Sequence, residues 1–424
     1  MTMTLLWFRN DLRLTDNRVL AAALIGASQL LPVYCRAPDE DTAWGFPRIG
    51  PHRRRFLDDT LRDLQQRLRA LGSDLLVLDG RAQDLLPALA REHGVGTVHA
   101  EEIPAPEEQD EINALREAGL TVRTHWQSSL LDPSTLPFRP AQVPEVFTRF
   151  RNDVERAGIQ PRPPLAAPTA LPPLPSGLVC PALPSPDADR DDPRSAFPYR
   201  DPAWCGGETA ALAHIGRYFG GRLPTTYKAT RNGLTGLDYA TKLSPWLASG
   251  ALSPRTVFAA LRAHEARCGE SDGSYWIWFE LLWRDHFRLL HVRHGRRLYR
   301  ARGLGDQPPP RHHAGRFDAW REGRTGQPFI DAAMRDLAAT GFLSNRMRQN
   351  VASYLIHDLG GDWRAGAAWF EACLIDYDAC SNQGNWLYLA GRGTDPRGSR
   401  RFNPDKQAGD YDADGAYRRL WATS

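Results

Sequence analysis

The chain has 424 residues and a formal net charge of +3, with 42% hydrophobic and 24% charged residues. This length exceeds what one ordinary core supports, so we expect two domains. The composition is typical of a soluble globular protein, no apolar run approaches the roughly 18–20 residues that span a bilayer, and the small charge does not by itself indicate a nucleic-acid partner.

The first 130 residues alternate apolar runs with amphipathic stretches. The opening MTMTLLWFRNDLRL has charges directly behind a short apolar run, which favours a first strand over a signal peptide. The runs typical of strands are 4–8, 29–35, 74–79, 97–100 and 121–126. The clearest helical stretch covers 53–72 and ends on a glycine. This alternation predicts a doubly wound parallel sheet. No G-x-G-x-x-G follows the first strand, so a nicotinamide dinucleotide site of the usual type is not expected.

Thirteen of the thirty-three prolines fall between 161 and 202, which predicts an extended connector. The pattern after it is helical nearly throughout. The predicted helices are 208–219, 254–269, 275–294, 329–340, 345–359 and 365–375. We therefore expect an α/β domain over 1–132, a connector over 133–203 and an all-helical domain over 204–424.

The six cysteines show no C-x-x-C spacing. This pattern favours a reducing cytoplasm and argues against a disulfide framework or a thiolate metal site. Between Arg284 and Arg324 there are eleven arginines, four acidic residues and no lysine. Such a stretch is typical of a surface for phosphate backbones, although a merely solvated face explains it equally well.

Three groups of residues could carry chemistry. Glu280, Trp283, Arg284 and Phe287 share one helical face, which suits recognition of a flat heterocycle or, alternatively, a core tryptophan beside a surface ion pair. The second group, Thr241 and Ser244, stands at a predicted helix start before Pro245. It could cradle a phosphate or simply cap the helix.

The third group is the stretch 374–386, LIDYDACSNQGNW. Its Asp376 and Asp378 follow a helix, and Arg348 is a candidate partner because a buried arginine usually has a carboxylate beside it. Catalytic carboxylates, a helix cap and the polar rim of a cofactor all remain open. A metal site is not favoured, since no histidine or further acid clusters with them.

Long motifs resemble the photolyase/cryptochrome family and run in its order from one end of the chain to the other. They are 7-WFRNDLRLTDN, 239-YATKLSPWLASGALSPR, 278-WFELLWRDHFR, 323-GRTGQPFIDAAMRDLAATGFLSNRMRQNVASYL and 376-DYDACSNQGNW. Others are similar to its DASH cryptochrome branch, namely 130-LLDPSTLPF, 147-FTRFRNDVE, 227-YKATRNG and 402-FNPDKQAGDYDADGAYRRLW.

The resemblance implies FAD folded into a U in the helical domain and a 5,10-methenyltetrahydrofolate antenna in the α/β domain. The implied FAD contacts are Tyr227, Thr241, Lys242, Leu243, Ser244, Arg284, Arg348, Asp376, Asp378 and Asn382. Within this set Arg348 pairs with Asp376, and the Asn382 amide faces flavin N5 and supports the reduced flavin. Glu107 or Glu108 matches the folate-contacting glutamate, an acidic helix start being the alternative.

In the family, an excited reduced flavin donates an electron to a cyclobutane pyrimidine dimer, the ring splits, and the electron returns. Photolyases flip the dimer out of the stack to reach it. The resemblance assigns the dimer pocket to Glu280 and Trp283, and DNA contacts to Arg231, Asn345, Arg346, Gln349, Tyr388 and Gln407. Tyr388 stands where duplex photolyases carry a second tryptophan. A smaller stacking surface favours single-stranded DNA as the substrate.

Trp386 and Trp363 match the first two tryptophans of the chain that reduces the flavin by electron hopping. Pro310 stands where the third is expected, ten residues before Trp320. We therefore expect slow or rerouted photoreduction, with Tyr299 as one candidate for another route.

Three hypotheses follow: a light-driven dimer repair lyase, a blue-light receptor with vestigial repair, and a nucleic-acid binder with a structural flavin. The retained pair Glu280 and Trp283 and the arginines favour repair. We expect a monomer in the cytoplasm, without membrane contact, that binds DNA carrying pyrimidine dimers.

Overall fold

The computed structural model describes residues 3–185 and 189–422. Its N-terminal part is a five-stranded parallel sheet in the order β3-β2-β1-β4-β5. The strands are β1 Met3–Phe8, β2 Gln29–Arg36, β3 Leu76–Asp79, β4 Thr97–Glu101 and β5 Val122–His125. Each strand lies on one of the predicted apolar runs, and the doubly wound parallel topology is confirmed.

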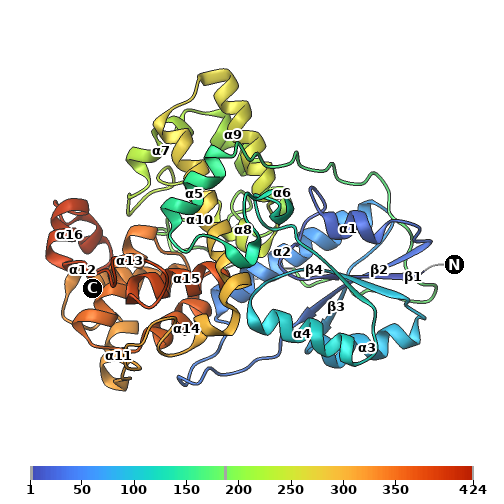
Figure 1. Ribbon diagram of the computed structural model, residues 1–424, viewed down its shortest axis with the longest axis horizontal. Helices are drawn as coiled ribbons and strands as arrows, with labels where there is room; N and C mark the ends of the chain where they lie inside the picture. The colour runs from blue at the N-terminus through green and yellow to red at the C-terminus, as the bar shows by residue number, and fades with distance from the viewer. Residues whose placement is uncertain (1–2, 186–188, 423–424) are drawn as a thin grey trace.

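Helices cover both faces of the sheet (Figure 1). Successive side chains of a strand point to opposite faces. Leu6 and Phe8 of β1 therefore join the core under α1 and α2, and Leu5 and Trp7 join the core under α3 and α4. These helices are α1 Arg18–Ala23, α2 Pro51–Ala70, α3 Ala82–Glu92 and α4 Pro106–Glu117.

Beyond β5, the described chain forms helices and loops without a strand, which confirms the predicted all-helical part. The α-helices are α5 Phe147–Arg156, α6 Glu208–Gly220, α7 Leu223–Thr230, α8 Ser244–Ser249, α9 Pro254–Cys268, α10 Asp272–His294, α11 Ala314–Arg321, α12 Pro328–Thr340, α13 Asn345–Ser353, α14 Trp363–Cys373, α15 Ala379–Ala390, α16 Pro404–Tyr411 and α17 Ala416–Leu420. Short 3-10 helices are η1 Pro133–Thr135, η2 Pro140–Gln142 and η3 Gly295–Tyr299, and Tyr354–Asp358 is a π-helical turn. None of the helices described in 3–422 is long and apolar enough to span a bilayer.

The proline-rich segment runs along the α/β part without a helix or strand in its described residues 159–185 and 189–207 (Figure 1). Hydrogen bonds hold it there: the N–H of Leu30 donates to the Pro173 carbonyl at 3.1 Å, and the N–H of Leu165 donates to the Asp16 side-chain carboxylate at 3.1 Å. Helix α5 lies inside the range 133–203 that the sequence assigns to the connector. It packs on α10, where Phe147 stacks on Trp283. The boundaries of the three segments stay predictions.

The central element is α10, a 23-residue helix that begins with a capping box between Ser271 and Ser274. It contacts α5, α7, α9 and α15. Its buried Asp285 accepts the N–H groups of Leu130 and Leu131 at 2.8 and 2.7 Å. These bonds fasten the end of the α/β part to the helix that carries much of the candidate site.

Candidate functional site

A cavity of about 530 Å³ lies among α13, α14, α15 and the turn between the last two. This α13–α15 cavity gathers many of the residues that the sequence singles out. Those on its wall are Asn345, Arg348, Gln349, Asp376, Asp378, Asn382 and Trp386. This lining, with Trp386 among carboxylate, amide and guanidinium groups, suits a cofactor ring system with polar groups at its edge.

The stretch 374–386 forms the turn after α14 and the first part of α15. Asp378 caps α15, because its carboxylate accepts the N–H of Ser381 at 2.7 Å. Ser381, Asn382 and Asn385, which follow Asp378 by three, four and seven positions, also line the cavity. One face of α15 therefore supplies this part of the wall. Ser381 and Asn385 were not predicted from the sequence, although their helical spacing from Asp378 was a usable signal.

Arg348 and Asp376 pair across the cavity wall, as the resemblance implies. Arg348 Nη2 donates to Asp376 Oδ2 at 2.8 Å, and Nε donates to the Leu343 carbonyl at 2.8 Å. The Asp376 side chain is only 1% exposed. Its second oxygen, Oδ1, is buried and has no partner among the described residues. Leaving a buried acceptor unsatisfied is costly, so Oδ1 points to a ligand that donates a hydrogen bond.

The orientation of the Asn382 amide follows from one contact. Its Nδ2 donates to the Ala367 carbonyl at 3.0 Å. A carbonyl oxygen only accepts, so the nitrogen must lie on that side and the amide oxygen on the other. Asn382 thus presents an acceptor to the α13–α15 cavity.

Arg284 joins α10 to the rim of this cavity. Its Nη2 lies 3.6 Å from Asp378 Oδ2, and its guanidinium also donates to the carbonyls of Ser128 and Leu247. Burial opposes ionisation of Asp378, but Arg284, Arg288 and the N–H bond it accepts outweigh burial and lower its pKa. The carboxylate therefore stays charged.

The backbone before α8 is strained in a way that suits an anion. Ala240 and Lys242 have φ of 55° and 57°, in the left-handed region that non-glycine residues rarely adopt. Left-handed Lys242 followed by right-handed Leu243 turns successive N–H groups toward one side, which forms an anion-binding concavity. No side chain caps α8, so the alternative of simple capping by Thr241 or Ser244 is not realised.

The side chain of Lys242 adds to this cradle. It is 2% exposed, and its ammonium has no hydrogen-bond partner in the described chain. The ammonium lies 3.1 Å from the centre of the Tyr239 ring. Burial lowers the pKa of Lys242 well below its usual value. An unpaired buried cation is costly, and an anionic ligand would remove that cost.

The residues assigned to DNA and the dimer gather nearby, from α7, α10 and α13. Arg231 forms an ion pair with Glu280 and lies over the Trp276 ring at 4.3 Å. Burial raises the pKa of Glu280, and Arg231 opposes that rise. Arg346 bonds Asn232, the neighbour of Arg231, at 3.0 Å. The cluster is therefore continuous from Glu280 to α13.

Other predicted residues lie around this cluster. Arg346 also donates to Gln349 at 3.1 Å, and Gln407 on α16 accepts a 3.4 Å bond from Asn350. Tyr227 is buried on α7, the helix that packs on α10. Neither it nor Gln407 lies on the wall of the α13–α15 cavity.

Trp283 and Tyr388 meet edge to face, with ring centres 6.0 Å apart. The Trp283 face stacks on Phe147 at 3.8 Å, and the Arg400 guanidinium lies 5.1 Å from the centre of the Tyr388 ring. Part of each aromatic surface is therefore occupied by the protein itself.

Trp363 and Trp386 are both 1% exposed. The Trp363 indole N–H donates to the Ala301 carbonyl at 3.1 Å. Pro310 lies in the loop between η3 and α11, and Tyr299 is bound through its hydroxyl to His291 at 3.1 Å. Within the part of the chain that the structure describes, Tyr299 makes no aromatic ring contact with Trp363.

The candidate antenna residues Glu107 and Glu108 lie in the first turn of α4. This is the acidic helix start that the sequence offered as the alternative to a folate contact. Exposed Glu107 forms an ion pair with Arg48, which also binds Glu371 at 2.7 Å. Burial raises the pKa of Glu108, and its backbone carbonyl accepts a bond from Arg9 at 3.1 Å. No group of three or more His, Cys, Asp or Glu residues in 3–185 and 189–422 could hold a metal ion.

Comparison with known proteins connects this geometry to chemistry. Residues 276–424 match the FAD binding domain of DNA photolyase, and residues 4–170 match the DNA photolyase model. The chain is 47% identical to Cryptochrome DASH of Xenopus laevis over 97% of its length and 81% of that protein. It is 40% identical to Cryptochrome DASH, chloroplastic/mitochondrial, of Arabidopsis thaliana over 99% and 75%. The crystal structure of Synechocystis sp. PCC6803 cryptochrome superposes with a TM-score of 0.93 at 42% identity, covering 99% of this chain and 88% of that one.

Proposed function

The chain belongs to the photolyase/cryptochrome family and is similar to Cryptochrome DASH proteins over nearly its full length, and from this premise we propose that it repairs cyclobutane pyrimidine dimers by light, chiefly in single-stranded DNA. In enzyme terms it would be a deoxyribodipyrimidine photo-lyase. The observation that carries the proposal is the continuous cluster of Glu280, Arg231 and Arg346 beside Trp283 and the α13–α15 cavity.

The chain contains a photolyase-type FAD-binding domain, and its residues fit FAD. Lys242 and the left-handed backbone beside it suit the diphosphate, and the free oxygen of Asp376 suits a ring N–H group. Bound FAD would supply light-driven electron transfer. Arg348 would hold Asp376 in place, and the Asn382 oxygen would accept a hydrogen bond at the flavin edge.

Glu280 and Trp283 would then receive the dimer, with the arginines of α7 and α13 on its phosphates. A base inside a duplex must be unpaired and unstacked before it enters such a pocket, which costs a few kcal/mol. A single strand avoids most of this cost. The smaller stacking surface of Tyr388 therefore supports single strands as the preferred substrate.

Replacing Tyr388 with tryptophan should raise repair of duplex DNA more than repair of single strands. Added stacking of about 1 kcal/mol corresponds to roughly fivefold tighter binding of the flipped dimer. The measurement is the ratio of duplex to single-strand repair rates at subsaturating DNA. Tyr388→Phe keeps the ring and removes only the hydroxyl, so it should leave the ratio near that of the wild type. An unchanged ratio in Tyr388→Trp would show that stacking does not set the preference.

Photoreduction provides a separate prediction, because no tryptophan stands at Pro310. Pro310→Trp should accelerate flavin photoreduction in the presence of a thiol reductant, followed by the loss of oxidised flavin absorbance. Gln307→Trp, an exposed position in the same loop, is the control. No gain in Pro310→Trp would count against the missing exit as the cause of slow photoreduction.

We also propose a 5,10-methenyltetrahydrofolate antenna contacted by Glu107 or Glu108, and a monomer that works in the reducing cytoplasm. All six cysteines lie in the described residues and are free, which supports a reducing compartment. Absorbance spectra of the purified protein, before and after acid release of chromophores, test the antenna.

A blue-light receptor with vestigial repair is the second candidate. The observation that favours it is the coverage of the Trp283 face by Phe147 and of the Tyr388 ring by Arg400. A receptor would bind FAD and respond to light without removing dimers. A nucleic-acid binder with a structural flavin would leave bound DNA unchanged by light.

A further inference from the structure

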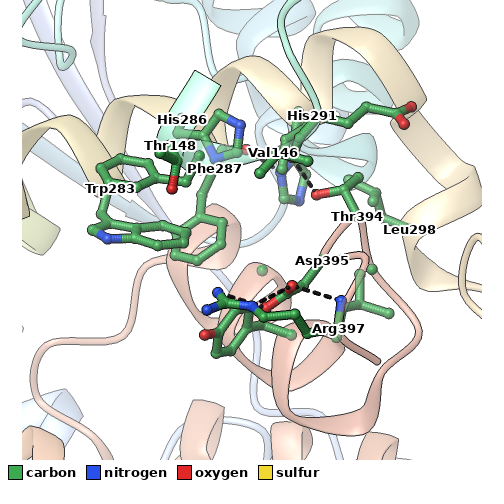
Figure 2. A pocket seen from close by; sticks show the side chains of 17 residues that line it. Val146, Thr148, Trp283, His286, Phe287, His291, Leu298, Thr394, Asp395 and Arg397 are labelled. Carbon is green, nitrogen blue, oxygen red and sulfur yellow. Dashed lines mark hydrogen bonds and ion pairs between the residues drawn. The ribbon is translucent and has the colours of Figure 1, made fainter. Parts of the chain in front are cut away.

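A second cavity, of about 590 Å³ with its mouth included, lies on the other side of α15 (Figure 2). We call it the α5–α15 cavity, because the start of α5, one face of α10, α15 and the loop 393–397 enclose it. Its α15 residues are Gly384, Leu387 and Tyr388. They follow Asn382, Asn385 and Trp386 of the α13–α15 cavity by two positions, in that order. Two positions turn a helix by about 200°, so the cavities lie on opposite faces of α15.

The walls of the α5–α15 cavity are aromatic and aliphatic. Figure 2 shows Trp283, His286 and Phe287 on one side, with Asp395 and Arg397 across from them. Trp283 and Tyr388 belong both to this wall and to the residues assigned to the dimer, so a ligand here would sit directly beside the dimer.

His286 contributes an acceptor without a partner. Its Nε2 lies 2.8 Å from the Pro144 carbonyl. Because that oxygen only accepts, Nε2 carries the hydrogen and Nδ1 is left with a lone pair. The residue is 1% exposed, and Nδ1 has no hydrogen-bond partner in the described chain. Burial lowers the pKa of His286 to about 4, so the ring stays neutral at neutral pH.

His291, the other histidine on the cavity wall, has a hydrogen-bond partner at both ring nitrogens. His291 Nδ1 donates to the Phe287 carbonyl at 2.8 Å, and Nε2 accepts from the Tyr299 hydroxyl at 3.1 Å. His286 is therefore the lining histidine that calls for an outside donor. A buried acceptor without a donor is costly, and a ligand N–H group would satisfy it.

The charged lining residues of the cavity are paired: Glu145 binds Arg293 at 3.1 Å, and Asp395 binds two arginines. Arg397 is exposed and binds Asp395 through Nε at 3.1 Å, and Arg400 binds the same carboxylate at 2.8 Å. Two guanidinium groups share one carboxylate, so this pairing leaves one positive charge in excess. A phosphodiester chain passing the mouth would meet that charge.

We propose that the α5–α15 cavity binds one unpaired base next to the dimer in single-stranded DNA. Every nucleobase has a π-face for the aromatic wall and an N–H group for His286, so the site would tolerate any sequence. A paired base could enter only after its pair opened, so the cavity would add affinity chiefly for single strands. This inference rests on the proposed function, because it takes the dimer to lie against Trp283 and Tyr388.

The test uses single-stranded oligonucleotides with one dimer and, on its 5′ or its 3′ side, a normal base, an abasic site or 2-aminopurine. The full-length protein with bound FAD should quench 2-aminopurine on one side of the dimer. An abasic site on that side should weaken binding by about tenfold. Thr148→Trp, which fills the exposed mouth, should abolish both effects, and Thr148→Ser should keep them.

Circular dichroism and flavin content show whether each Thr148 variant is folded. Equal quenching on both sides, or equal affinity for abasic and normal strands, would overturn the inference. Persistence of the base effect in a folded Thr148→Trp would overturn it as well. Dimer repair is measured in the same wild-type samples. Absence of repair counts against the proposed function, whereas the binding contrasts judge the cavity independently of it.

Discussion

Asp376→Asn is expected to fold and to purify with little FAD. The Asp376 side chain is 1% exposed and pairs with Arg348 at 2.8 Å, so asparagine keeps the shape and removes the charge that Arg348 needs. Removing one partner of a buried ion pair costs about 3–5 kcal/mol. Because the pair borders the α13–α15 cavity, we expect most of this loss in cofactor affinity, a weakening of roughly a hundredfold or more.

Flavin-to-protein absorbance ratios and titration of the apoprotein with FAD measure this effect. Asp358→Asn is the matched control, since Asp358 pairs at 2.8 Å with Arg401, whose side chain is 67% exposed. Exposed pairs contribute about 1 kcal/mol or less, so this variant should retain its flavin. Full FAD content in a folded Asp376→Asn would show that the pair does not hold the cofactor.

The second large effect is expected from Asn382→Asp. The amide nitrogen donates to the Ala367 carbonyl at 3.0 Å, and aspartate would place an acceptor oxygen there instead. It would also set a negative charge beside the reduced flavin. A loss of about 1–3 kcal/mol lowers the two-electron potential of the flavin by roughly 20–60 mV.

Redox titration followed by flavin absorbance measures the shift. Asn385→Asp lies one turn further along α15, where the native amide bonds the Ser381 carbonyl at 2.8 Å in an exposed position. Its added charge is screened by solvent, so its shift should be much smaller. Equal shifts in the two variants would mean that charge alone, and not the orientation of Asn382, governs the potential.

Local patterns were sufficient to predict much of this fold. The strands have continuous apolar runs because both faces of the sheet are covered, and α10 has helical spacing over many turns. Helix α5 was missed inside the predicted connector. Its buried Phe147, Phe150 and Val154 recur at three- and four-residue spacing, but the prolines that follow mask so short a pattern.

The candidate site depends on contacts that no local pattern contains. Ser381 and Asn385 could have been found from helical spacing, whereas Tyr227 and Lys242 came from the family resemblance. The direction of the Asn382 amide depends on Ala367, and the free Nδ1 of His286 depends on Pro144. These partners are distant in sequence, so their effect appears only once the chain is folded.

Dimer repair by the purified, photoreduced protein under blue light is the most direct test of the proposed repair function. Single-stranded and duplex oligonucleotides carrying one cyclobutane pyrimidine dimer are compared in parallel, with dark samples as controls. We predict loss of the dimer in illuminated single strands and much slower loss in duplexes. Intact dimers in both substrates, with flavin and DNA still bound, would contradict it and favour the blue-light receptor.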